Sequence, residues 1–147
     1  MGIKTKIFVT LIFTLVGLEL FSQITWANTF TMGGINDDNS RDIIVDNNGN
    51  FYLIGSFSNT LDIDPGPGQT ILTSMGGTDG FIAKYNSNGN LQWVNVYGSL
   101  YCDYGFRVHI DPFGNVFCSG YVEGVADLDA GPGTYTVSGR QYLIKLT

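Results

Sequence analysis

The chain has 147 residues, of which 44% are hydrophobic and 14% charged, a composition typical of one folded globular domain rather than a disordered chain. Its 20 glycines and 14% aromatic residues favour short strands joined by tight turns. Seven Lys and Arg against thirteen Asp and Glu give a net charge of -6, which excludes the basic surface that nucleic-acid binding needs.

The N-terminal segment 1–22 has the pattern of a secretory signal peptide. Lys4 and Lys6 form a basic start, residues 7–18 are mostly apolar, and Ser22 is a small residue at a suitable cleavage point. A membrane anchor is the alternative, but the run is shorter than the about 20 apolar residues that span a bilayer. We expect cleavage near Ser22, no membrane span afterwards, and a mature chain, 23–147, that is secreted or held at the cell surface.

An internal repeat follows the signal segment. Four blocks recur in the same order, the first two at an offset of 65 positions, and the matching ranges are 42–55 with 107–120, 62–68 with 127–133, 81–85 with 142–146, and 26–30 with 93–97. Recurrence of this kind indicates a repeat architecture. It divides the mature chain into a leading fourth-strand segment and loop, 23–41, a full repeat, 42–106, and an incomplete repeat, 107–147.

The blocks of the full repeat alternate between apolar runs and turn sequences, and no window has a helical period. Pro65 and Pro67 exclude a strand from the stretch 62–68, because proline provides no ladder donor. In chain order we expect strands at 43–45, 51–57, 81–85 and 91–97, with turns at 46–50 and 86–90. An all-β fold is therefore predicted, in which each repeat is a four-stranded antiparallel meander like one blade of a β-propeller.

Five short motifs of the full repeat carry a family resemblance. They are Val-Asp-x-x-Gly-Asn-x-Tyr at 45–52, Gly-Ser-Phe at 55–57, Asp-x-Asp-Pro-Gly at 62–66, Asp-x-Phe-x-x-Lys-Tyr at 79–85 and Gly-Asn-Leu-x-Trp at 89–93. In this order they resemble the SBBP repeat, or β-propeller repeat, of bacterial secreted proteins, over essentially the whole mature region. The second copy departs at Tyr121, Ala130 and 140–141. The resemblance implies part of a seven-bladed propeller in an exported protein, frequently followed by a C-terminal sorting domain, and no shared catalytic residues.

Two aspartate pairs are the candidate metal ligands. Asp62 and Asp64 stand beside a Gly-rich turn, and Asp127 and Asp129 stand in the corresponding place of the second copy. Carboxylates at this spacing suit Ca²⁺, but the downstream Glu of an EF-hand is missing. The favoured interpretation is that these residues accept hydrogen bonds from loop backbone N–H groups. Calcium is therefore a possible cofactor, and no other is expected.

Three further residues have more ordinary interpretations than catalysis. Asp46 and Asp111 each precede x-x-Gly-Asn, so we expect them to stabilise hairpin turns rather than act as paired carboxylates. His109 stands where the first copy has Ile44, and nothing in the sequence provides it with a catalytic partner, which favours a structural position.

The cysteines and tryptophans leave alternatives open. Export would permit a disulfide between Cys102 and Cys118, but Cys118 falls in a predicted strand and suits a buried apolar position equally. Trp26 and Trp93 begin matching blocks, where they either bind sugars or, as we favour, pack one repeat against the next.

The sequence therefore predicts a non-enzymatic extracellular interaction or structural module whose partner is a protein or a glycan. The alternatives are a fragment of a propeller enzyme that acts on extracellular glycans, and a Ca²⁺-dependent adhesion element. Because the chain stops after the third-strand block 142–146, we expect further blades downstream. Without them the mature chain is expected to be aggregation-prone, oligomeric or partly folded.

Overall fold

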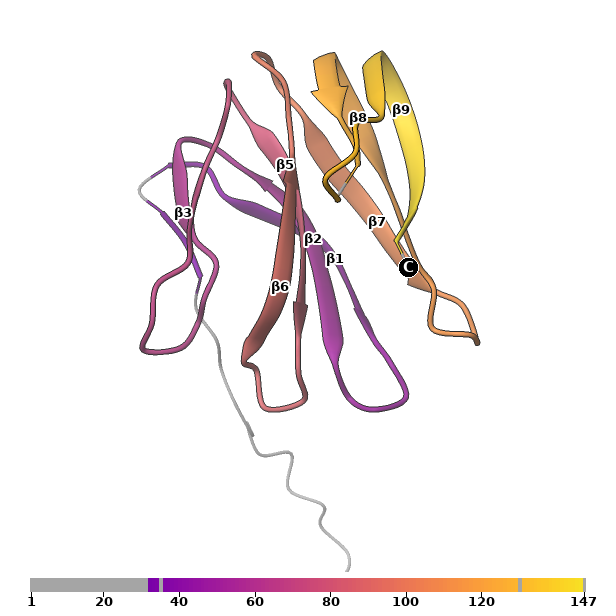
Figure 1. Ribbon diagram of the computed structural model, residues 1–147. Helices are drawn as coiled ribbons and strands as arrows, with labels where there is room; N and C mark the ends of the chain where they lie inside the picture. The colour runs from indigo at the N-terminus through magenta and orange to yellow at the C-terminus, as the bar shows by residue number, and fades with distance from the viewer. Residues whose placement is uncertain (1–31, 35, 130, 147) are drawn as a thin grey trace, which may run out of the picture.

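The computed structural model describes residues 32–34, 36–129 and 131–146. This part of the chain contains β-strands and no helix, so the predicted all-β class is confirmed (Figure 1). The strands are β1 (Asn39–Val45), β2 (Phe51–Phe57), β3 (Thr60–Asp62), β4 (Ile71–Thr73), β5 (Asp79–Tyr85), β6 (Leu91–Tyr97), β7 (Tyr104–Ile110), β8 (Val116–Asp127) and β9 (Thr136–Leu146).

The first sheet has the strand order β1-β2-β5-β6, with every neighbouring pair antiparallel. Between β2 and β5 the chain forms a separate two-stranded sheet of β3 and β4. The sequence predicted β2 and β6 with their observed bounds, but it missed β3 and β4. Each is only three residues long, so a pattern of alternating polarity has no length over which to show itself.

The second sheet has the order β7-β8-β9 and the same strand pairing as the first. The pairing of β1 with β2 begins with Asn39 opposite Ser56, and the pairing of β7 with β8 begins with Tyr104 opposite Tyr121. Each residue of the second pair lies 65 positions after its counterpart in the first pair. Both pairings shift register after the second residue pair, so both edge strands have a bulge in the same place.

The two sheets differ in the hairpin that follows their second strand. In the second sheet β8 and β9 are long and remain paired as far as Asp127 and Thr136, so the counterpart of the β3–β4 hairpin is fused to the sheet. Residues 74–78 separate β4 from β5 in the first sheet, whereas in the second sheet only Gly139, with φ of 54°, lies near the corresponding point. Because this connection is shorter, β9 runs without a break through the positions that correspond to β4 and β5.

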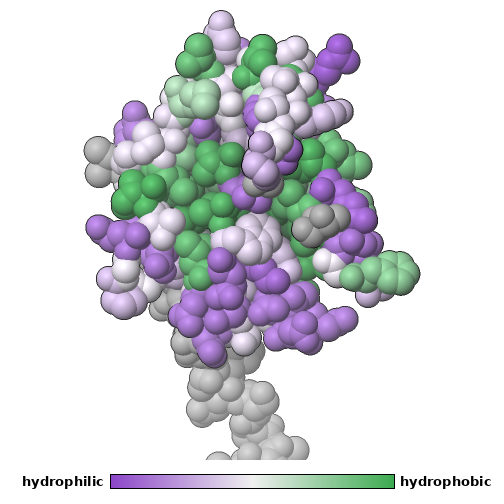
Figure 2. Space-filling view, viewed as in Figure 1, coloured by the Kyte–Doolittle hydropathy of each residue, from purple (hydrophilic) through white to green (hydrophobic). Residues whose placement is uncertain are grey.

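Apolar side chains on one face of each sheet hold the two sheets together. The junction face of the first sheet and the facing side of the second form one buried cluster, whose residues are Ile44, Tyr52, Ile54, Ile82, Trp93, Val108, Ile110, Val116, Cys118, Ile144 and Leu146. A neighbouring cluster packs Tyr97 of β6 against Val122, Ala126 and Tyr142 of the second sheet and against Leu128 in the loop after β8. Apolar side chains accordingly gather across the middle of the molecule, and polar ones lie at the end where the hairpin turns are (Figure 2).

The β3–β4 hairpin covers part of the opposite face of the first sheet (Figure 1). Leu61, Ile63 and Leu72 pack there against side chains of β2 and β5. The two stacked sheets do not form a closed ring within the residues that the structure describes.

Candidate ligand-binding cleft

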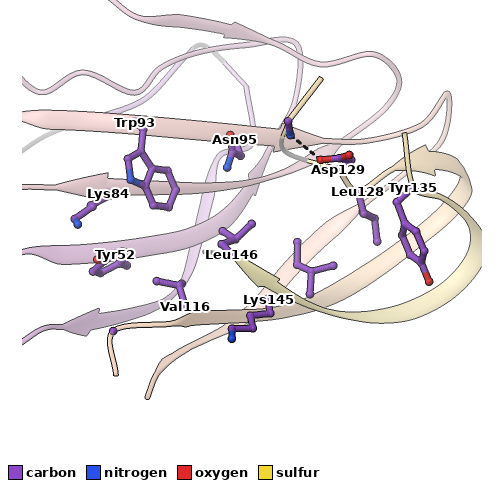
Figure 3. A pocket seen from close by; sticks show the side chains of 13 residues that line it. Tyr52, Lys84, Trp93, Asn95, Val116, Leu128, Asp129, Tyr135, Lys145 and Leu146 are labelled. Atoms are coloured by element: carbon purple, nitrogen blue, oxygen red, sulfur yellow. Dashed lines mark hydrogen bonds between the residues drawn. The ribbon is translucent and has the colours of Figure 1, made fainter. Parts of the chain in front are cut away.

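A cleft of about 760 Å³ opens between the two sheets. One wall consists of residues on the junction face of the first sheet, and the other consists of β8, β9 and the loop between them (Figure 3). The lining residues are Tyr52, Lys84, Trp93, Asn95, Gly114, Val116, Leu128, Asp129, Gly131, Tyr135, Ile144, Lys145 and Leu146. Several of these residues, Tyr52, Trp93, Val116, Ile144 and Leu146, also belong to the inter-sheet apolar cluster, so the cleft borders that contact.

Aromatic and cationic side chains alternate on the wall from the first sheet. Tyr52, Lys84 and Trp93 are direct neighbours across β2, β5 and β6, so their side chains share one face. The rings of Tyr52 and Trp93 meet edge to face with centroids 6.0 Å apart, and Lys84 Nζ lies 5.0 Å from the Tyr52 ring centroid. Trp93 is half-buried and projects toward the second sheet (Figure 3), so it both packs and lines the cleft.

Lys145 borders the other wall through β9, but its side chain lies on the face of the second sheet that is turned away from the first sheet, since its neighbours Ile144 and Leu146 pack in the inter-sheet cluster. Lys145 of β9 is exposed, and its Nζ lies 5.9 Å from the ring centroid of Phe117 on the adjacent strand. This pair stands where Lys84 and Tyr52 stand in the first sheet, so each sheet has one lysine against one aromatic ring. Tyr135 closes the end of the cleft nearest the β8–β9 loop (Figure 3).

One carboxylate lines the cleft, and the backbone holds it in place. Asp129 Oδ1 accepts a hydrogen bond from Gly131 N at 2.7 Å. Lys84 is the cation on the facing wall, so the cleft combines one positive and one negative side chain in a protein whose formal net charge is -6.

The four aspartates considered as metal ligands accept backbone hydrogen bonds. Asp62 Oδ1 accepts the amides of residues 64 and 70 at 3.2 and 3.0 Å, and Asp127 Oδ1 accepts those of residues 129 and 135 at 3.0 and 2.8 Å. Asp64 Oδ1 accepts Gly66 N at 2.8 Å, as Asp129 does for Gly131. These bonds lower the pKa of Asp127. Within the described part of the chain no three His, Cys, Asp or Glu side chains form a group suited to a metal ion.

Asp46 and Asp111 stabilise hairpin turns in the same way. In each turn one carboxylate oxygen accepts two backbone amides, and the other accepts the side-chain amide of Asn50 or Asn115 at 2.8 or 2.6 Å. These hydrogen bonds, that of the Asn side chain first, lower the pKa of both carboxyl groups.

The remaining sequence candidates lie apart from one another. His109 is exposed on β7 opposite Phe117. Cys118 is buried in the inter-sheet core, which raises the pKa of its thiol to about 12, and both Cys118 and Cys102 are free. Trp26 and the signal segment 1–22 lie outside the described residues.

The sequence analysis did not single out two carboxylates that the structure buries, those of Asp79 and Asp103. Asp103 accepts hydrogen bonds from Ser99 N and, at 2.8 Å, from Glu123 N, while Asp79 Oδ2 accepts Met75 N at 2.8 Å. Burial, and then the nearby Asp103, raise the pKa of Asp79. Neither residue lines the cleft. Asp79 bonds to the loop before β5, and Asp103 bonds to the loop before β7 and to β8, so both positions are structural. The Asp-x-Phe motif at 79–81 was the available signal for Asp79.

No helix in the described residues is long and apolar enough to cross a membrane. Comparisons with protein-family models, with curated proteins and with solved structures found no match to this chain.

Proposed function

We propose that the chain is an exported, non-catalytic interaction module built from β-propeller-type units. The matching pairing of the two sheets, with a bulge in the same place, and their face-to-face apolar packing support this proposal. The motif order that resembles the SBBP repeat supports it as well. Export itself rests on the N-terminal segment 1–22, and detection of a mature chain that begins near Gln23 outside the cell is the outcome we expect.

We further propose that the inter-sheet cleft binds an acidic saccharide. The observation that carries this assignment is the combination of aromatic and cationic groups within one cleft. Sugar C–H groups pack on aromatic rings such as Trp93, and the Lys84 ammonium attracts carboxylate groups such as those of uronic acids. Asn95 provides both a donor and an acceptor for hydroxyl groups.

The cleft favours binding over hydrolysis. Most glycoside hydrolases place two carboxyl groups on either side of the scissile bond, about 5–9.5 Å apart. Asp129 is the single carboxylate among the described residues that line the cleft, and its Oδ1 already accepts a backbone amide. The alternative function, a fragment of a glycan-degrading enzyme, would therefore need a second carboxylate from elsewhere.

Calorimetric titration with an oligosaccharide of uronic acids, and with a neutral oligosaccharide of the same length, tests the proposal. We expect binding of the acidic ligand only, weakening as salt is added. Trp93→Ala should weaken it about tenfold, and Lys84→Gln up to about fivefold, because exposed ion pairs contribute about 0.2–1 kcal/mol.

Arg140→Gln is the matched control, since Arg140 is an exposed cation on β9 that does not line the cleft. It should leave the affinity unchanged. Equal affinity for the two saccharides, or no binding of either, would contradict the proposed ligand.

A further inference from the structure

Two buried carboxyl groups lie where the connection between the sheets meets the loop before β5. Asp79, the first residue of β5, is 2% exposed, and Asp103, at the end of the connection, is 0% exposed. A Cβ at Gly98 would collide with the Asp79 carboxylate, and the next residue, Ser99, donates its amide to Asp103 Oδ2. Two adjacent residues of the connection therefore hold the two carboxyl groups close to each other.

The two groups differ in how completely they are hydrogen-bonded. Both oxygens of Asp103 accept backbone amides, those of Ser99 and Glu123. Asp79 Oδ2 accepts Met75 N at 2.8 Å, but Asp79 Oδ1 is buried and has no hydrogen-bond partner among the described residues. Burying a charged group without a partner is costly, and a protonated carboxyl group carries no charge. Asp79 is therefore the group that gains by taking up a proton.

The surrounding segments provide no cation to offset the two charges. The segments that adjoin the pair contain no Lys, Arg or His, and they are residues 56–58, 74–78, 97–102 and 122–124. Their titratable side chains are two phenols, one thiol and one exposed carboxylate, those of Tyr97, Tyr101, Cys102 and Glu123. β9 adds the buried phenol of Tyr142 and the exposed Arg140, which makes no ion pair with either carboxylate. Proton uptake by Asp79 is thus the available way to remove one charge.

The pair lies where three segments are joined. The amides of Gly77 and Thr78 donate to Tyr101 O at 2.9 and 3.3 Å, and Asp103 N donates to Thr78 O at 2.7 Å. Asp103 Oδ1 accepts Glu123 N of β8 at 2.8 Å. The loop 74–78, the connection 98–103 and the second sheet therefore meet at the two carboxyl groups.

We propose that Asp79 and Asp103 form a proton-operated latch, which is closed when Asp79 is protonated and loosened when both carboxyl groups are ionised. Ionisation of Asp79 leaves two negative charges in a buried space, and outward movement of the loop 74–78 admits water to Asp79 Oδ1. This loop lies at the surface, with Met75 66% exposed. The joint between the sheets is thus tighter in acidic surroundings, whatever ligand the cleft binds.

The sign of the pH effect follows from proton linkage. Burial, and then the charge of Asp103, raise the pKa of Asp79 above its ordinary value of 3.8, so the closed latch holds the proton more tightly than the open one. Closure is therefore most favoured below that value, weakens as pH rises to the raised pKa, and stays weak above it. Asp46, whose pKa is lowered, has the opposite effect.

Hydrogen exchange of the Gly77 and Thr78 amides in the full-length purified chain, measured from pH 4 to pH 8, tests the latch. Protection relative to intrinsic exchange should fall as pH rises, about tenfold for each unit by which folding raises the pKa of Asp79. In Asp79→Asn the side-chain oxygen can still accept Met75 N but the group cannot ionise, so this fall should disappear.

Asp37→Asn is the matched control, because it makes the same chemical change at an exposed carboxyl group. Its protection should fall with pH as in the unchanged chain. A side-chain NMR titration of Asp79 in the unchanged chain needs no variant, and its midpoint should lie above 3.8.

Four outcomes would overturn the proposal. The first is a midpoint at or below 3.8. The second is a fall in protection that persists in Asp79→Asn, and the third is a difference between this variant and the unchanged chain that is the same at every pH. The fourth is protection restored at neutral pH by added Ca²⁺ or Na⁺, since a cation and not a proton would then neutralise the pair.

Discussion

Gly55 and Gly120 show how one position shapes both sheets. A Cβ at Gly55 would collide with the carbonyl oxygen of Asn39, and a Cβ at Gly120 would collide with that of Tyr104. Those carbonyl groups lie beside the bulges of β1 and β7. The missing side chain therefore permits the close approach of the edge strand, which explains why glycine recurs there.

Gly55→Ala should destabilise the protein by about 1–3 kcal/mol, the usual effect of inserting a group into a packed site. Gly33→Ala is the same chemical change, but its Cβ would meet nothing closer than Asp38 Oδ2 at 3.8 Å, and it should cost less than about 0.5 kcal/mol. Urea unfolding of the two variants provides the comparison. Similar midpoints for both would contradict the role of the bulge.

Residue roles were predictable from the sequence where they are local. The turn-stabilising role of Asp46 and Asp111 followed from the next four residues, and the structure shows those hydrogen bonds. The cleft was not predictable, because Trp93 and Ile144 come together only when the two sheets stack, and spacing along the chain does not contain that information.

At the scale of the element, three hairpin turns use one design. The turns after β1, β5 and β7 each have a glycine as their fourth residue, with φ between 79° and 86°. In each, the first residue accepts two backbone amides through a side-chain oxygen. That first residue is Asp46, Asn86 or Asp111, so the chain itself shows that an amide oxygen can replace a carboxylate there.

Asp46→Ala should therefore destabilise the protein by about 1 kcal/mol, and Asp46→Asn by less, since Asn keeps the acceptor. The pKa of Asp46 is lowered in the folded state from its ordinary value of 3.8. Its contribution is thus present above that value and is lost as pH falls through the lowered pKa. Thermal unfolding from pH 7 to pH 2 should show this loss in the unchanged chain and a smaller one in Asp46→Asn. An acid response that is the same in both would contradict this assignment.

Strand prediction was accurate for β2 and β6, gave only part of β1 and β5, and missed β3 and β4. Strands were expected at 43–45 and 81–85, whereas β1 begins at Asn39 and β5 begins at Asp79. The seven-residue strands β2 and β6 alternate or run apolar between clear turns, and their bounds were correct. The sequence did not predict that β8 and β9 continue through the positions where the first sheet has the separate strands β3 and β4. This continuity depends on the short connection at Gly139, which has positive φ.

For the whole molecule, the shared core makes the two sheets one unit. Ile54 and Ile82 of the first sheet are fully buried against Val108 and Cys118 of the second. Neither sheet covers its own junction face, so each depends on the other to remove it from water. Whether the mature chain alone is fully folded, as opposed to the expected partly folded state, is tested by the unfolding measurements below.

Ile54→Ala should cost about 2–5 kcal/mol, the range for emptying a core position, and both sheets should still unfold in a single transition. Circular dichroism and hydrogen exchange in β2 and β8 provide two independent probes. Ile71→Ala in β4 is the control, because Ile71 is half-exposed, and it should change little. Two separated transitions would show that the sheets are independent.

The cleft is formed by two neighbouring sheets together, so the number of such clefts depends on how many sheets are stacked. Lys145 and Phe117 stand where Lys84 and Tyr52 stand, so each added junction would bring another cation and another ring. The number of sites would then increase with the number of stacked sheets. A polymeric ligand that engages several sites together gains avidity through effective concentration without any new contact. The number of stacked sheets would thereby set how much more tightly a long polymer binds than a short one.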